Sequence, residues 1–144
     1  MPATPTVPLS HRDLLGALFA VIATNGPSGK PQVTAIAFHH DTTEDLVKIS
    51  LNDARQKTKN MRRDPQATLF ILDPANPQRS LEIRADVELQ PDPDFEFART
   101  AGARYGMDFH DNDLPGETRS IVVLHPTRVL ATGIGEDGMQ VVAG

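Results

Sequence analysis

Residues 45–73, DLVKISLNDARQKTKNMRRDPQATLFILD, combine two apolar runs with a basic segment between them. Apolar and polar residues alternate over 46–51, which predicts a half-buried strand, and the apolar run 67–72 predicts a second strand. Between the two runs we expect a short helix over residues 54–63, capped by Asp53 and ended by the proline that follows.

The basic segment concentrates positive charge in an otherwise acidic chain. Residues 53–64 hold five Lys and Arg against two Asp, a local charge of +3, while the whole chain carries −5 and the remainder therefore −8. Helix N-terminal N–H groups and arginine forks favour phosphate, so the pattern is typical of an anion site. The alternative is an ordinary Lys- and Arg-rich surface helix. Arg55 and Lys57 fall in the first turn, where cations oppose the helix dipole, and this misplacement favours the anion site.

Length and composition indicate one domain and exclude several classes of function. We expect a flexible lead-in over residues 1–9 and a single domain over residues 10–144, long enough to bury roughly two-thirds of its unfolded surface. A pI near 5.4 disfavours nucleic-acid binding, and the absence of cysteine excludes disulfides and thiolate chemistry. We find neither a signal peptide nor an apolar stretch of membrane-spanning length, and we expect a cytoplasmic protein.

The remaining chain is mostly predicted strand. In chain order, we expect a helix over 10–18 opened by a Ser10–Asp13 capping box, strands over 18–25 and 32–40 joined by the turn 26–30, a loop over 73–80, a strand over 81–90, a helix over 91–106, an acidic loop over 107–117, two strands within 120–133 broken near Pro126, and a weak final strand over 139–143. Sequential antiparallel strands with the helices set aside predict an α+β fold, a six-stranded antiparallel barrel with short flanking helices.

Common catalytic and metal motifs are missing. GPSGK at 26–30 lacks the glycine spacing of a P-loop, and Pro31 stands where a Ser or Thr would follow the lysine. His39 and His40 are neighbours on a predicted strand and point to opposite faces, which disfavours a shared metal. The aspartates of 107–117 lack the glycine and the closing glutamate of a calcium loop, so we expect a solvated loop there. We predict no metal site and no catalytic side chain, which places any reactive centre on a cofactor.

The run ARQKTKNMRRDP, residues 54–65, resembles the A-R-x-K-x-x-N-[LMI]-x-x-[DN]-P signature of split β-barrel flavin-binding proteins of the pyridoxamine 5′-phosphate oxidase type. AVIAT at 20–24 and VTAIAF at 33–38 extend the resemblance, which runs from about residue 14 to 132. The closer match is the actinobacterial branch that uses the deazaflavin cofactor F420. The resemblance implies a split-barrel homodimer with its cofactor sites at the interface.

By position, the resemblance also implies a set of cofactor-binding residues. These are Arg55, Lys57 and Thr58 for the cofactor phosphate, Asn60 in support from the helix, Ile49 and Ser50 along the ring and ribityl chain, and Gln32 and Thr34 against the ring or linker. For the pair on strand 32–40, an ordinary polar strand face is the alternative. The loop 107–117 is expected at the rim of the substrate pocket.

The function that the resemblance implies is an F420-dependent oxidoreductase, which passes a hydride from the reduced deazaflavin to an unsaturated small organic acceptor. An FMN-dependent oxidase or reductase is one alternative, since FMN needs only the Arg55 and Lys57 pair. A non-catalytic cofactor-binding protein is another. F420 carries a polyglutamate tail as well as a phosphate, and Lys59, Arg62 and Arg63 are expected to supply the additional positive surface.

Overall fold

The two apolar runs form strands with a helix between them, as the sequence predicts. The computed structural model describes residues 4–135 and 138–143. Its elements are η1 (Leu9–Gly16), β1 (Phe19–Asn25), β2 (Pro31–Ala37), β3 (His39–Asp41), β4 (Leu46–Asn52), α1 (Gln56–Arg63), β5 (Gln66–Leu72), β6 (Ser80–Pro91), α2 (Glu96–Ala103), η2 (Phe109–Asn112), β7 (Arg119–Gly135) and β8 (Gly138–Ala143). None of the helices in these two ranges is long and apolar enough to cross a membrane.

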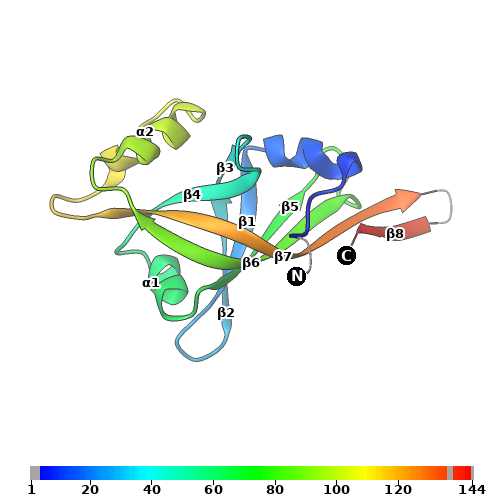
Figure 1. Ribbon diagram of the computed structural model, residues 1–144, viewed down its shortest axis with the longest axis horizontal. Coiled ribbons are helices and arrows are strands. Elements are labelled where there is room, and N and C mark those ends of the chain that lie inside the picture. Colours follow the sequence, from blue (N-terminus) through cyan, green and yellow to red (C-terminus); the bar gives the residue numbers. More distant parts are fainter. Residues whose placement is uncertain (1–3, 136–137, 144) are drawn as a thin grey trace.

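The strands pair antiparallel in the order β2-β1-β5-β6-β7-β4-β3, and β8 adds to β7 (Figure 1). The two outermost strands of this path, β2 and β3, are separated along the chain by Phe38 alone. Two successive peptide units span at most about 7 Å, so the sheet must curl until its ends meet. This closure makes a barrel, and the α+β antiparallel class predicted from the sequence is confirmed.

The barrel encloses the core on the inward face of each strand. Strand β5 shows the alternation directly, with Ala67, Leu69 and Ile71 buried while its other side chains face outward. Tyr105 closes the point where β2 and β3 meet: its hydroxyl donates to the carbonyl of Leu18 and accepts from the amide of Phe38 at 3.2 Å. Hydrogen bonds from this one side chain therefore hold the barrel closed between β2 and β3.

The number of strands differs from the expected six. The sheet has eight strands. The expected strand 32–40 divides at Phe38, and the weak final strand expected over 139–143 is present as β8. The expected break near Pro126 is also wrong, since β7 is one strand of 17 residues. The register against β6 shifts between Arg84 and Ala85, which leaves Thr127 in a bulge beside the proline. A bulge absorbs a residue that cannot donate to the ladder, so the strand continues.

Two predicted helix caps are wrong because their side chains have other partners. The first turn of the chain, η1, is a 3-10 helix with Pro8 at its N-cap and no side-chain cap, and Ser10 Oγ lies 2.8 Å from His11 Nδ1 instead. Helix α1 begins after Arg55, also without a side-chain cap. Asp53 accepts from Ser120 Oγ at 2.6 Å and from the hydroxyl of Thr118, which ties the end of β4 to β7.

The second helix is shorter than predicted. Residues 91–106 were expected to be helical throughout, whereas α2 covers only Glu96–Ala103. The carboxylate of Asp92 accepts from the amides of Phe97 at 3.2 Å and Ala98 at 3.0 Å, so it caps the helix from four residues upstream. Figure 1 shows α2 and the loop after it at one end of the barrel, on the β3 and β4 side.

Candidate functional site

A cleft of about 360 Å³ opens where α1 begins, between the ends of β2 and β4. Its lining residues come from β2, β4, the start of α1, η2 and β7, and they are Ile36, Ala37, Ser50, Leu51, Asn52, Arg55, Lys57, Phe109 and Arg119. Three of the predicted site residues, Ser50, Arg55 and Lys57, thus lie together in one cleft.

Of the three cations that line the cleft, Arg119 is paired with Asp113, whereas Arg55 and Lys57 lack an ionic partner in residues 4–135. Arg55 is exposed in extended backbone at the N-cap of α1, and Lys57 is half-buried two residues further on, within the first turn. Neither takes part in an ion pair there, and for the half-buried Lys57 this is unusual, because most other buried or half-buried charged side chains of these residues are paired. Burial, followed by the charge of Arg55, lowers the pKa of Lys57. An anion placed between the two groups would relieve both effects.

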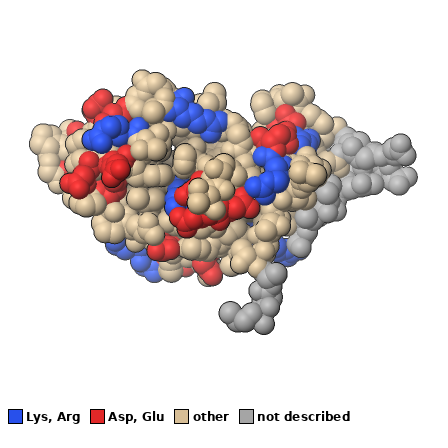
Figure 2. Space-filling model, turned by 45° about the horizontal axis from the view of Figure 1, so that its top comes forward, with Lys and Arg blue, Asp and Glu red and all other residues tan. Residues whose placement is uncertain are grey.

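A second cavity, of about 340 Å³, lies beneath residues 4–7, and its charged groups are already in ion pairs. His40 Nε2 lies 2.8 Å from Asp45, and Asp45 lies 2.7 Å from Arg12. Lys48 likewise lies 2.8 Å from Glu44. Figure 2 shows acidic and basic side chains interspersed on the molecular face turned toward the viewer. The unpaired cations at α1 therefore distinguish the first cleft.

Thr58 and Asn60 lie beneath the cleft and do not line it. Both side chains are fully buried, and the Thr58 hydroxyl donates to the carbonyl of Asn52 at 2.9 Å. The Asn60 amide donates to Gln32 Oε1 at 2.8 Å and to Thr24 Oγ1 at 3.1 Å. These bonds fasten α1 to β1, β2 and β4 and so fix where the helix begins.

The predicted residues on the strands are placed in different ways. Gln32 is half-buried and accepts the bond from α1, whereas Ile49 is 1% exposed and belongs to the core. The hydroxyl of Thr34 is buried without a hydrogen-bond partner in the described part of the chain. Thr34 shares its face of β2 with Ile36, which lines the cleft. A buried orphan hydroxyl beside a cleft is a group that a polar ligand can satisfy, so these residues fit a bound cofactor.

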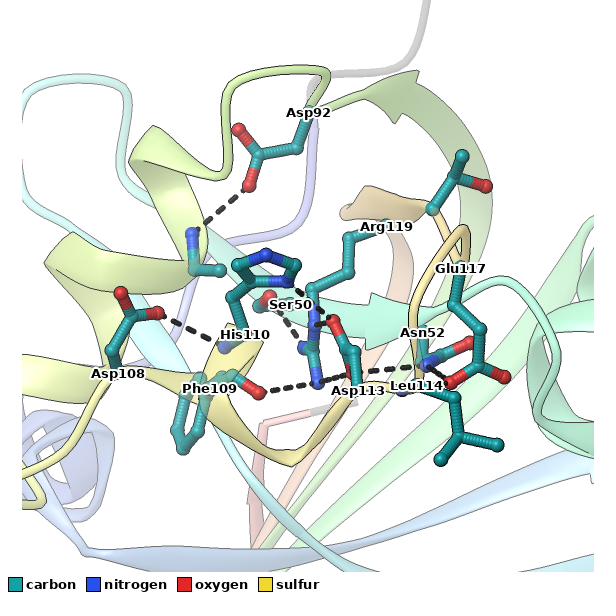
Figure 3. A network of polar contacts seen from close by, with 12 residues as sticks. Ser50, Asn52, Asp92, Asp108, Phe109, His110, Asp113, Leu114, Glu117 and Arg119 are labelled. Carbon is teal, nitrogen blue, oxygen red and sulfur yellow. Dashed lines mark hydrogen bonds and ion pairs between the residues drawn. The ribbon is translucent and has the colours of Figure 1, made fainter.

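An ion pair that was not predicted from the sequence joins β7 to the loop beside the cleft (Figure 3). Arg119 lies in two-point contact with Asp113, with Nε 2.7 Å from Oδ2 and Nη2 3.0 Å from Oδ1. The same guanidinium donates to Ser50 Oγ at 3.0 Å and to the carbonyl of Phe109 at 2.9 Å. Asp113 is only 2% exposed, so the expectation of a solvated loop is wrong at this residue. A single sequence carries no signal for this pair, because neither residue belongs to a local pattern.

Asn52, also missed, joins this loop to the start of α1. Its amide nitrogen donates to Asp113 at 2.9 Å and to Glu117 at 3.1 Å, while its amide oxygen accepts from the backbone of Ala54 at 2.7 Å. The end of β4 therefore positions the basic helix and the acidic loop together. No group of three or more His, Cys, Asp or Glu in the described ranges has metal-site geometry.

Asp113 gives the fold an acid-sensitive contribution. Burial alone would raise the pKa of this carboxyl, but hydrogen bonds from Arg119, His110 and Asn52 lower the pKa to about 2. A folded pKa below the ordinary value stabilises the fold by roughly 2 kcal/mol near neutral pH, and this contribution disappears as the pH falls from about 4 toward 2. Urea unfolding at pH 6 and pH 3 measures it: we expect the wild type to lose about 1 kcal/mol more than Asp113→Asn. Equal losses in the two proteins would contradict this assignment.

Known proteins share this fold, and one of them shares about a third of the aligned sequence. A family model described as pyridoxamine 5′-phosphate oxidase matches residues 10–133. A solved structure named F420 reductase is 34% identical, and the match covers 85% of this chain and 98% of that chain with a TM-score of 0.72. The conserved hypothetical protein Rv2991 from Mycobacterium tuberculosis is 19% identical, covering 88% and 84% of the two chains at a TM-score of 0.67.

A pyridoxamine 5′-phosphate oxidase-related, FMN binding protein from Nostoc punctiforme is 14% identical, covering 90% of this chain and 81% of that one at a TM-score of 0.65. At such identities the Mycobacterium and Nostoc structures share the fold alone. The family model, in contrast, spans most of the chain, including β4, α1 and the cleft. This chain therefore belongs to the pyridoxamine 5′-phosphate oxidase family of split β-barrels.

Proposed function

We propose that this protein is an F420-dependent oxidoreductase that reduces an unsaturated organic acceptor. The observation that carries the proposal is the pair of cations, Arg55 and Lys57, which have no ionic partner in residues 4–135 and line a cleft whose remaining wall is of mixed apolar and polar character. The structure named F420 reductase, at 34% identity, supports this choice within the family. A bound deazaflavin would supply the hydride chemistry.

The residues of the chain act in this proposal by binding and placement. Arg55 and Lys57 hold the cofactor phosphate through charge-assisted bonds, and the half-buried lysine gains most because the anion restores its preference for the charged form. Thr58 and Asn60 keep the helix start in position from below. Gln32 and Thr34 face the ring or linker from β2, and Ile49 and Ser50 support it from β4. The apolar part of the lining excludes water from the reacting face.

The choice between F420 and FMN depends on charge beyond the phosphate site. Of the three further cations of α1, Arg62 lies 3.2 Å from Asp53, and Arg63 donates to the carbonyl of Asn25. Lys59 is exposed and has no ion pair among the described residues. We assign Lys59 to the glutamate tail of F420, which FMN lacks. An FMN-dependent oxidase or reductase is the second candidate, because Arg55 and Lys57 suffice for FMN.

The protein acts as a homodimer in this proposal, with the cofactor site at the interface. The outward face of β1, β2 and β5 supports this arrangement. It exposes Phe19 and Val33 at 60% each, Phe70 at 36% and Leu72 at 46%. Strand pairing places these side chains on neighbouring strands, with Val21 opposite both Ala35 and Phe70. Exposed apolar faces of this kind mark interaction sites.

Turnover separates an enzyme from a carrier. Reduced F420 is mixed with the protein and a panel of conjugated enones and quinones, and the return of the oxidised absorbance is followed. We expect protein-dependent oxidation with at least one acceptor, and its loss in Arg55→Ala at F420 concentrations that saturate the wild type. Tight F420 binding without turnover on the whole panel would favour the non-catalytic cofactor-binding protein instead.

A further inference from the structure

The loop 107–117 is fastened behind the cleft at two points by one side chain (Figure 3). Arg119 donates to the carbonyl of Phe109 and forms the two-point pair with Asp113. Phe109 lines the cleft, and Arg119 itself is only 9% exposed. The position of the Phe109 wall therefore depends on a charged contact made on β7, outside the loop.

A second set of contacts holds the other side of the loop. His110 Nδ1 lies 3.0 Å from Asp113, and its ring stacks on Phe95 with centroids 3.5 Å apart and planes 8° from parallel. Phe95 has φ of 57°, in the left-handed region that a bulky side chain seldom adopts. Backbone strain of this kind persists where the surroundings hold it and is typical of functional segments. The loop is thus held in one defined arrangement.

Apolar residues in place of a buried ion pair often give a fold of equal stability, because desolvation offsets most of the attraction between the charges, so stability alone does not explain why a pair is present. A two-point arginine–carboxylate contact instead fixes orientation. In this protein the pair fixes a cleft wall. Arg55 and Lys57 lie at one end of the cleft, where the proposed function places the phosphate. A cofactor ring would then lie against the apolar part of the remaining wall, which includes Phe109 and Leu51.

We infer that Asp113 and Arg119 are positioning residues that hold Phe109 against the cleft and thereby shield the bound cofactor ring from water. The shielding rests on the proposed function, whereas the tether is a property of the chain without cofactor. Asn52 assists from β4 by bonding to Asp113, which couples the loop to the helix that binds the phosphate.

Hydrogen exchange on the full-length, cofactor-free protein tests the tether. Asp113→Asn keeps the shape of the side chain and removes its charge. We expect loop amides such as those of Asp111 and Asp113, both hydrogen-bonded within the loop, to lose protection by about tenfold or more. Asp73→Asn is the matched control. Asp73 also pairs with an arginine, since its carboxylate lies 3.1 Å from Arg79, but neither residue lines the cleft. It should leave the loop unchanged, and unchanged protection in Asp113→Asn as well would overturn the inference.

Collisional quenching tests the shielding. Acrylamide is a neutral quencher, so its access to the bound fluorescent cofactor does not depend on the charge that the substitution removes. We expect the quenching constant to rise several-fold in Asp113→Asn and in Phe109→Ala, which opens the wall without touching the ion pair, and to stay at the wild-type value in Asp73→Asn. Where Asp113→Asn does not fold, Arg119→Lys keeps the charge and loses the two-point contact, and it should show the same rise.

The outcomes separate this inference from the proposed function. Intact cofactor affinity with unchanged quenching in the Asp113, Arg119 and Phe109 variants overturns only the inference. A chain that binds neither F420 nor FMN overturns the proposed function and the shielding together, and the exchange experiment still decides the tether.

Discussion

Replacing Arg55 or Lys57 by alanine is expected to weaken cofactor binding by about 1.5–3 kcal/mol each, roughly 10- to 150-fold in Kd. The reason is that both cations lie at the cleft without an ionic partner in residues 4–135, so the bonds they make to a phosphate are lost without replacement. The effect is measured by fluorescence titration of each cofactor-free variant with F420.

Two controls accompany this titration. Arg84→Ala removes an exposed arginine that pairs with Glu82 at 2.9 Å on β6, and it should leave Kd unchanged. Lys59→Ala should weaken F420 binding and leave FMN binding intact, because only F420 has the glutamate tail. Unaltered affinity in both Arg55→Ala and Lys57→Ala, with the fold preserved by circular dichroism, would show that the basic helix is a structural feature only.

The second large effect is expected from Val33→Asp on the outer face of β2. If two copies meet on the apolar face of β1, β2 and β5, this change buries an unpaired carboxylate in the interface, which costs several kcal/mol. We expect light scattering at micromolar concentration to report a dimer for the wild type and a monomer for the variant. Cofactor affinity should fall along with the mass, because the proposed site lies at the interface.

Leu9→Asp serves as the control for this experiment, since Leu9 is 88% exposed at the first residue of η1 and belongs to none of the three strands. It should remain a dimer with unchanged affinity. A monomeric wild type that binds cofactor as tightly as expected would contradict the interface site and leave the phosphate site standing.

The fold could be predicted where local pattern and burial agree. The alternation in 46–51 and 67–72 led to β4 and β5 because every second side chain there enters the core. The predicted number of strands is wrong where contacts between residues distant in sequence determine where a strand begins, ends or continues. Tyr105 anchors the break at Phe38, and the bulge opposite Arg84 lets β7 pass Pro126. Tyr105 and Arg84 are each more than forty residues away from the positions they affect, so a local sequence pattern does not reveal them.

The predicted helix caps are also wrong because of contacts that the local sequence pattern does not show. Asp53 has the residue type and the position of an N-cap, yet its carboxylate bonds to Thr118 and Ser120, more than sixty residues away in the chain. Local propensity is a weak guide when a partner from another strand can take the same acceptor. The capping box at Ser10 shows the same competition over a shorter range, because its hydroxyl contacts the neighbouring His11.

In the candidate site, too, the residues with a local sequence signal were predicted, and those that act through distant contacts were not. Arg55 and Lys57 stand out in the sequence because their charge opposes the helix dipole, and the structure places both in the cleft. Asn60 entered only through the family resemblance, and its role as a link between α1 and β2 is evident only from its buried contacts. Asn52 and Arg119 were missed, since each acts through a loop whose acidic residues look solvated in the sequence.

An equilibrium titration of the cofactor-free protein tests most directly whether the cleft and its cations Arg55 and Lys57 bind a deazaflavin. F420 binding is followed by fluorescence, with FMN run in parallel under the same conditions. We expect micromolar or tighter binding of F420 and weaker binding of FMN. Preference for FMN would favour an FMN-dependent oxidase or reductase instead. Failure to bind either cofactor would contradict the proposal that the cleft is a cofactor site.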